Sequence, residues 1–171
     1  MSESDSFGVH HAGSRSGGEL THEALRGWRA WKVVERKDGP TLVSWWLGTL
    51  WPAHRALEAV CPWHGSRPVM HHACGIHAFG SRDDALAYIG RSREPLLFSR
   101  RPERALGVAL GRVSGWGRTV QHTRGWRSQY AYPYDLYLLD GGRDLARALA
   151  NAYAVETSPF LPPSSERQLV Q

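Results

Sequence analysis

The chain has 171 residues and a mass of 19.1 kDa, the size of one domain. Hydrophobic residues make up 42% and charged residues 22%, a balance that argues against a wholly disordered or fibrous chain. No apolar run has the length of a membrane span, and the N-terminal MSESDSFGVHHAGSRSGG lacks the apolar core of a signal peptide. With two cysteines and no export signal, we expect a cytoplasmic protein with reduced thiols and no membrane partner.

The formal net charge is +5, and it is unevenly distributed. Residues 1–26 carry a net charge of −2 and residues 158–171 are neutral, so residues 27–157 carry +7. All basic residues except Lys32 and Lys37 are arginines, which bind phosphate in a bidentate manner and stack on aromatic rings. GC-rich codon usage explains the arginine bias equally well. A basic body nevertheless favours anionic partners.

Composition predicts three parts in the chain. Residues 1–26 are rich in Ser, Gly and His without apolar periodicity and are predicted to be a disordered leader. Residues 27–157 are predicted to form a single globular domain. Residues 158–171 contain three prolines and are predicted to form a flexible tail.

In the first half of the predicted domain, residues 28–35 and 41–47 are β-rich and are joined by a turn that contains Asp38 and Gly39. We then expect a short helix over residues 54–60 and a short strand over residues 75–79. Ser81 stands where an N-cap is expected, before a helix that continues to residue 89.

In the second half, residues 108–122 and 126–139 are predicted to form two long strands around a turn at residues 123–125. A last helix over residues 143–153 places Leu145, Leu149 and Tyr153 on one face. This order of elements predicts an α+β fold: a curved antiparallel sheet or half-barrel with two or three short helices and a small zinc knuckle.

Cysteine and histidine residues gather between residues 61 and 77, in the spacing of a zinc site. Short ligand pairs separated by a loop suit tetrahedral Zn²⁺. The predicted ligands are Cys61, His64, His72 and Cys74. His71 is an alternative to His72. Four protein ligands complete the coordination shell, so we expect a structural zinc ion.

Two other interpretations of the cluster stay open at this point. In a catalytic version, three of the ligands hold zinc and a water molecule takes the fourth position, assisted by His77 or Glu58. Alternatively, the cysteines are buried free thiols and the histidines reflect a His-rich sequence.

The predicted hairpin of residues 108–139 alternates aromatic and basic side chains. We expect His122 opposite Trp126, Arg118 opposite Tyr130 and Trp116 opposite Tyr132. Residues 112–127 include four arginines and no acid. Such a surface binds nucleic acid by stacking bases on rings while arginines contact phosphate. The candidate ligand-binding residues are Arg112, Trp116, Arg118, His122, Arg124, Trp126, Arg127, Tyr130 and Tyr132. The alternative is that these aromatic pairs are ordinary sheet packing.

Two segments resemble a family of small bacterial proteins whose activity is not established. The segment CGIHA at residues 74–78 is similar to the family pattern C-x-C-G-I-Y-A. Residues 116–133 are similar to W-G-R-x-x-x-H-x-x-G-Y-R-A-x-x-A-Y-P. The likeness extends over most of residues 27–157 and implies no mechanism. His72 occupies the first cysteine position of the pattern, which keeps a metal-binding side chain there, and His77 replaces the tyrosine.

Three functions are compatible with these features. The first is a binding module that engages nucleic acid or a nucleotide through the aromatic–arginine surface, with zinc as a structural cofactor. The second is a small enzyme acting on an anionic substrate, with His122 as acid or base and Asp135, Glu35 or Tyr132 assisting. The third is a protein-interaction adaptor, because Trp, Tyr and Arg also dominate protein interfaces.

Overall fold

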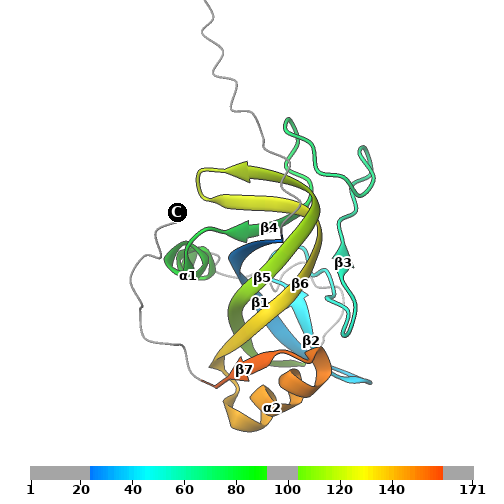
Figure 1. Cartoon of the computed structure of the whole chain (residues 1–171). Helices are drawn as coiled ribbons and strands as arrows, with labels where there is room; N and C mark the ends of the chain where they lie inside the picture. Colours follow the sequence, from blue (N-terminus) through cyan, green and yellow to red (C-terminus); the bar gives the residue numbers. More distant parts are fainter. Residues whose placement is uncertain (1–23, 92–103, 160–171) are drawn as a thin grey trace, which may run out of the picture.

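The computed structural model describes residues 24–91 and 104–159 (Figure 1). Most of the predicted leader, most of the predicted tail and residues 92–103, which include Arg93, Arg100 and Arg101, lie outside the described residues.

The described residues form one mixed, mostly antiparallel sheet of seven strands with two short helices, which confirms the predicted α+β class. The elements in chain order are β1 (Leu25–Arg36), β2 (Gly39–Ser44), β3 (Leu57–Glu58), β4 (Ile76–Phe79), α1 (Arg82–Arg91), β5 (Ala105–His122), β6 (Gly125–Asp140), α2 (Gly142–Tyr153) and β7 (Glu156–Ser158).

The sheet curls into a partial ring, as the half-barrel prediction anticipated. β1 pairs with β5, β5 with β6, β6 with β4, and β4 returns to β1 through the pair Trp28–Phe79. In Figure 1 the long strands β5 and β6 cross the whole molecule as one bent ribbon. Gly125 is required at the closure, because a Cβ there would lie 2.0 Å from the carbonyl oxygen of Ala78.

Helix α2 covers one end of the sheet (Figure 1) and seals the core. Of the three residues predicted to share one face, Leu149 and Tyr153 are 0% and 1% exposed, and Leu145 is partly buried against the same core. The Tyr153 hydroxyl donates to the Trp51 carbonyl at 2.7 Å and accepts from the Leu42 amide at 2.9 Å. This hydroxyl therefore fixes the connection that follows β2 against the core.

The predicted cap of α1 is confirmed, whereas the helix predicted over residues 54–60 is wrong. The Asp84 amide donates to Ser81 Oγ at 3.1 Å, so Ser81 is the N-cap. Residues 57–58 instead form β3, which pairs with β6. His54 has a φ of 58°, a left-handed conformation that a helix cannot contain, and its amide donates to the Tyr132 hydroxyl.

The β5–β6 hairpin is confirmed, but its register differs from the prediction. His122 pairs with Gly125, Trp116 pairs with Tyr130 and Ser114 pairs with Tyr132. The ladder shifts between Trp116 and Thr119, where Gly117 has a φ of 77°. This bulge breaks the alternation of faces, so side chains beyond it do not follow the face of Trp116.

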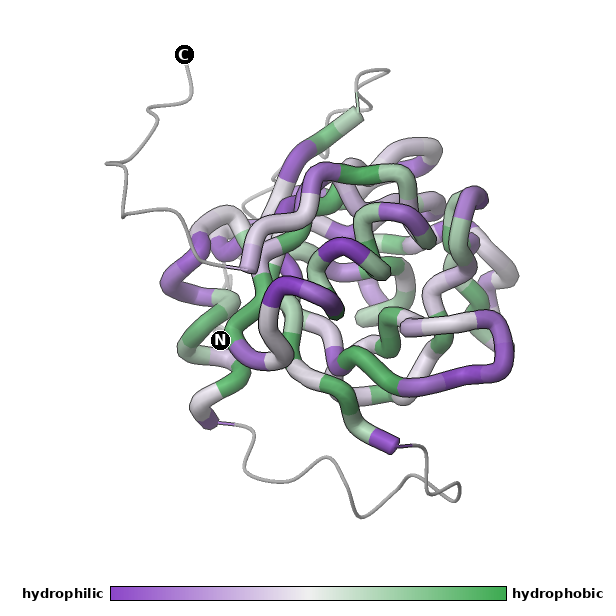
Figure 2. The backbone as a smooth tube through the Cα atoms, turned by 90° about the horizontal axis from the view of Figure 1, so that it is seen from below, coloured by the Kyte–Doolittle hydropathy of each residue, from purple (hydrophilic) through white to green (hydrophobic). Residues whose placement is uncertain are grey.

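Among the described residues, no helix is long and apolar enough to cross a membrane. Figure 2 shows why: hydrophobic stretches along the backbone are short and are interrupted by hydrophilic ones.

Candidate metal centre and aromatic surface

The four predicted metal ligands lie together in the loop of residues 61–74, which we call the knuckle loop. Their ligand atoms all lie within 4.8 Å of one another. Cys61 Sγ is 3.4 Å from His64 Nδ1 and 3.6 Å from His72 Nδ1, and Cys74 Sγ is 3.8 Å from His64 Nδ1. Tetrahedral Zn²⁺ bonded to sulfur and nitrogen separates these ligand atoms by about 3.6 Å. The arrangement fits a metal ion such as zinc.

A tight turn presents the first ligand pair. The amides and carbonyls of Cys61 and Gly65 bond reciprocally, at 2.8 and 2.9 Å. Gly65 adopts a φ of 62°, which a residue with a side chain rarely tolerates. The turn brings Cys61 and His64 to the same side of the loop.

The second ligand pair is held by Arg127 of β6. Its Nη1 donates to the carbonyls of Val69, His72 and Cys74, the last at 2.9 Å. Arg127 is 7% exposed. The prediction that Arg127 contacts phosphate on an open surface is therefore wrong. Its guanidinium is buried and donates hydrogen bonds to the backbone that positions the metal ligands.

The four donors are two thiols and two imidazoles, a set that could hold a metal ion such as zinc. Both cysteines are free thiols and both are buried, while little else in the knuckle loop is buried. His72 belongs to the cluster and His71 does not, which separates the two sequence alternatives. His77, considered as a helper in a catalytic version, directs Nε2 to the Ala73 carbonyl at 3.0 Å. Two thiols and two imidazoles complete a tetrahedral shell without water.

Part of the predicted aromatic surface assembles next to the knuckle loop. The rings of Trp116 and Tyr130 stack, with centroids 6.2 Å apart. Trp116 and Tyr132 also line a shallow hollow of about 440 Å³ together with Arg55. Arg118, which lies in the bulge between Trp116 and Thr119, is exposed.

Tyr132 is held rigidly in this hollow. Its hydroxyl donates to the Tyr153 carbonyl at 2.8 Å and accepts from the His54 amide at 3.0 Å. Burial raises the pKa of Tyr132 above its ordinary value. The hydroxyl therefore remains a neutral donor at physiological pH, and the ring keeps one orientation.

Three other predicted surface residues are engaged elsewhere. Trp126 is 5% exposed and its Nε1 donates to the Arg26 carbonyl, so it is a core residue and the prediction of an open ring is wrong. Arg112 binds the buried Asp135 carboxylate with Nε at 2.7 Å. Arg124 binds Asp84 at 2.6 Å. Because the guanidiniums of Arg112 and Arg124 are already paired with carboxylates, they are not free to bind phosphate.

The carboxylates considered as partners of His122 in an enzyme, Asp135 and Glu35, are both paired with arginines instead. His122 is mostly exposed at the end of β5. Its pKa is lowered first by partial burial and then by the charge of Arg127. Asp135 pairs with Arg112, ten residues away along β5, and Glu35 binds Arg104 at 3.2 Å. Neither carboxylate can orient His122.

Two residues with roles here were not predicted from the sequence: Gln129, which connects the metal cluster to the aromatic pair, and Arg55, which lines the hollow. The amide nitrogen of Gln129 donates to Ser66 of the knuckle loop and to the Tyr130 hydroxyl, both at 3.1 Å. Gln129 Oε1 accepts from the Arg118 amide at 3.4 Å. Arg55, in the segment taken for a helix, reaches the hollow because β3 pairs with β6. No local signal marks either residue.

A comparison of the sequence with protein-family models, with curated proteins and with solved structures found no match in any of the three. The resemblance to the small bacterial family therefore stays a prediction.

Proposed function

We propose that this protein is a non-enzymatic module that binds single-stranded nucleic acid, with a structural zinc ion in the knuckle loop. The observation that supports this most is the hollow of about 440 Å³ between Trp116 and Tyr132, with Arg55 at its wall. A base stacks in such a hollow, and the backbone of the strand passes the arginines outside it.

The charges around the hollow favour an anionic strand. Among the described residues, no carboxylate lines the hollow. Arg55 and Arg118 form no ion pair within residues 24–91 and 104–159, in contrast with Arg112 and Arg124. Arg55 in the wall of the hollow and the exposed Arg118, two residues after Trp116 in the chain, suit phosphates of a strand whose base stacks there.

The zinc ion has a positioning role in this proposal. When bound, it would link the two halves of the knuckle loop through Cys61, His64, His72 and Cys74. Gln129 then connects that loop, through Ser66, to Tyr130 and to the backbone of Arg118. Metal binding would therefore order the aromatic surface without taking part in chemistry.

The test is a fluorescence anisotropy titration of labelled oligothymidylate, in single-stranded form and as a duplex with oligoadenylate, at two salt concentrations. We expect tighter binding of the single strand and a steep loss of affinity with salt, because phosphate contacts release counterions. Trp116→Ala should weaken binding about ten-fold, since stacking contributes about 1–3 kcal/mol per base. Arg118→Ala should reduce the magnitude of the negative slope of log K against log salt by about 0.7.

Matched controls come from the same chain. Trp46 is 62% exposed but lies away from the hollow, and Arg147 is an exposed residue of α2. Trp46→Ala and Arg147→Ala should leave the affinity unchanged. Absence of binding at low salt would reject the nucleic-acid proposal and leave the adaptor alternative. If Trp46→Ala and Trp116→Ala changed the oligonucleotide affinity equally, the hollow at Trp116 would be rejected as the binding surface.

A further inference from the structure

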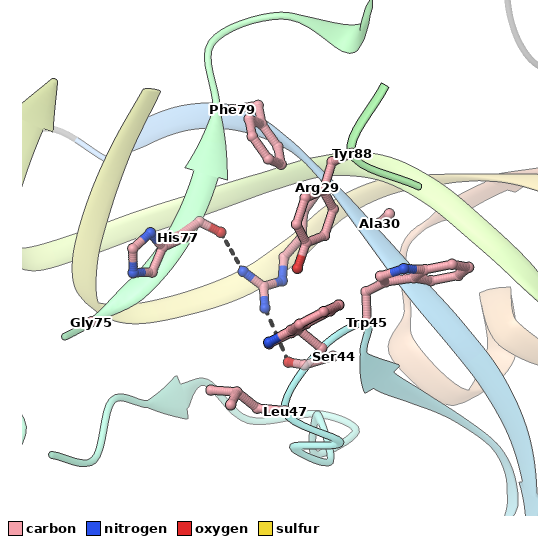
Figure 3. A pocket seen from close by; sticks show the side chains of 10 residues that line it. Arg29, Ala30, Ser44, Trp45, Leu47, Gly75, His77, Phe79 and Tyr88 are labelled. Atoms are coloured by element: carbon pink, nitrogen blue, oxygen red, sulfur yellow. Dashed lines mark hydrogen bonds between the residues drawn. The ribbon is translucent and has the colours of Figure 1, made fainter. Parts of the chain in front are cut away.

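A second cavity lies between β1, the connection that follows β2, β4 and α1, as Figure 3 shows. Its volume is about 290 Å³, near the lower end of the range of small-molecule sites. Most of its wall is aromatic or aliphatic, and one guanidinium enters it. The lining residues used below are Arg29, Ser44, Trp45, Leu47, Phe79 and Tyr88.

Arg29 is fixed in this cavity by neutral groups. Its Nη1 donates to the His77 carbonyl, and its Nη2 donates to Ser44 Oγ at 3.0 Å, both drawn as dashed lines in Figure 3. The guanidinium carbon also lies 5.1 Å from the ring centre of Trp51. Within residues 24–91 and 104–159, no carboxylate pairs with Arg29.

Two buried hydrogen-bond donors of the cavity wall have no acceptor. They are Nε of Arg29 and Nε1 of Trp45, and neither has a partner among the described residues. Leaving a buried donor unpaired costs about 1–3 kcal/mol, so such groups normally have partners. Both groups are donors, so a ligand that reaches them when the surrounding side chains shift must bring acceptor oxygens.

The charge of Arg29 is also poorly compensated. Burial lowers its pKa to about 10, with an opposing effect from the nearby Tyr88 hydroxyl. Burial raises the pKa of Tyr88, which keeps that hydroxyl neutral at physiological pH. A bound anion would relieve the cost of holding this cation away from water.

We propose that this cavity binds a small organic anion in which a carboxylate is attached to a flat apolar body, such as an aromatic carboxylate. The carboxylate accepts hydrogen bonds from Arg29 and Trp45, and the flat body lies against Phe79, Tyr88 and Leu47. A single guanidinium matches one negative charge, whereas a phosphate dianion needs further cations or donors. This site is separate from the nucleic-acid surface, because the two sets of lining residues share no member.

The experiment is isothermal titration calorimetry of the full chain with three probes at neutral pH: benzoate, benzamide and acetate. Benzamide keeps the ring without the charge, and acetate keeps the charge without the ring. We expect one benzoate per chain and an affinity at least about ten-fold above that of benzamide, because a hydrogen bond to a charged group contributes about 1.5–3 kcal/mol. Acetate should bind more weakly than benzoate, since it buries no ring.

Variants locate the binding. Arg29→Met should lower benzoate affinity at least about ten-fold, and Trp45→Phe, which keeps a ring and removes the donor, should lower it several-fold. Arg147→Met is the control and should bind as the wild type does. If Arg29→Met fails to fold, the comparison of benzoate with benzamide on the wild-type protein still tests whether the cavity binds the carboxylate. Equal binding of these two probes, or no binding of benzoate, would overturn the proposal. Trp116→Ala should retain benzoate binding, so failure of the nucleic-acid proposal is distinguishable from failure of this one.

Discussion

Replacing Arg127 with methionine tests whether this side chain positions the metal ligands. Its Nη1 has two hydrogens and serves three carbonyls of the knuckle loop, those of Val69, His72 and Cys74. The substitution therefore removes one to two hydrogen bonds to a charged group, each of about 1.5–3 kcal/mol. We expect a loss of about 2–5 kcal/mol in the free energy of unfolding.

The same substitution should weaken metal binding. Residues that orient metal ligands typically change affinity about 10–100-fold when they are replaced. Urea denaturation measures the first effect, and competition for zinc with a chromogenic chelator measures the second. Methionine approximates the length of the arginine stem, so the apolar part of the packing is largely kept.

Arg124→Met is the matched control for this prediction. Arg124 lies three residues earlier on the same hairpin and binds Asp84 at the surface. An exposed ion pair contributes about 1 kcal/mol at most, so this variant should lose little stability and no zinc affinity. If Arg127→Met is no worse than Arg124→Met in either assay, the assigned role of Arg127 is refuted.

Three further predictions concern the core, the sheet closure and the metal. Tyr153→Phe should lower stability by about 1–3 kcal/mol at neutral pH, because the Trp51 carbonyl and the Leu42 amide lose their partner. Since burial raises the pKa of Tyr153 from 10.0 to about 12, the unfolded chain ionises first, and urea titrations should show the wild-type advantage shrinking as pH rises from 10 to 12. Gly125→Ala should cost about 2 kcal/mol or more by thermal unfolding, since its Cβ would meet the Ala78 carbonyl oxygen and its φ of 152° is strained; a melting temperature equal to that of the wild type would contradict this. EDTA should lower the melting temperature and added zinc should restore it, whereas a melting curve that EDTA leaves unchanged would count against the metal.

Local sequence patterns predicted a large part of the fold. Asp38-Gly39 marked the first hairpin, Ser81 marked the cap of α1, and the spacing of Leu149 and Tyr153 marked the buried face of α2. These features depend on neighbours within a few residues, which is the range over which turn, cap and periodicity signals act. The metal cluster was predictable for the same reason, because its ligands come from one short loop.

The composition of the aromatic surface was not predictable from strand alternation. Gly117 adopts a left-handed conformation and shifts the register beyond Trp116, and Val120, which follows the bulge, is buried. The burial of Trp126 depends on β1 and β4, which lie far away in the sequence. The partners of Arg112 and Arg124 are likewise set by tertiary packing, through Asp135 and Asp84.

The Arg29 cavity was not predictable from the sequence either, because it too depends on contacts between segments that are far apart in the chain. Its wall comes from four separate elements, and nothing near Arg29 in the sequence shows that a carbonyl of β4 and Ser44 will hold the guanidinium. An arginine within an apolar strand is informative only when the position of its neighbours is known.

Zinc K-edge X-ray absorption of protein purified without a histidine tag tests most directly whether Cys61, His64, His72 and Cys74 hold a metal ion. We expect about one zinc per chain with two sulfur ligands at about 2.3 Å and two nitrogen ligands at about 2.0–2.1 Å. Folded protein without zinc, or zinc bound by nitrogen and oxygen alone, would contradict it.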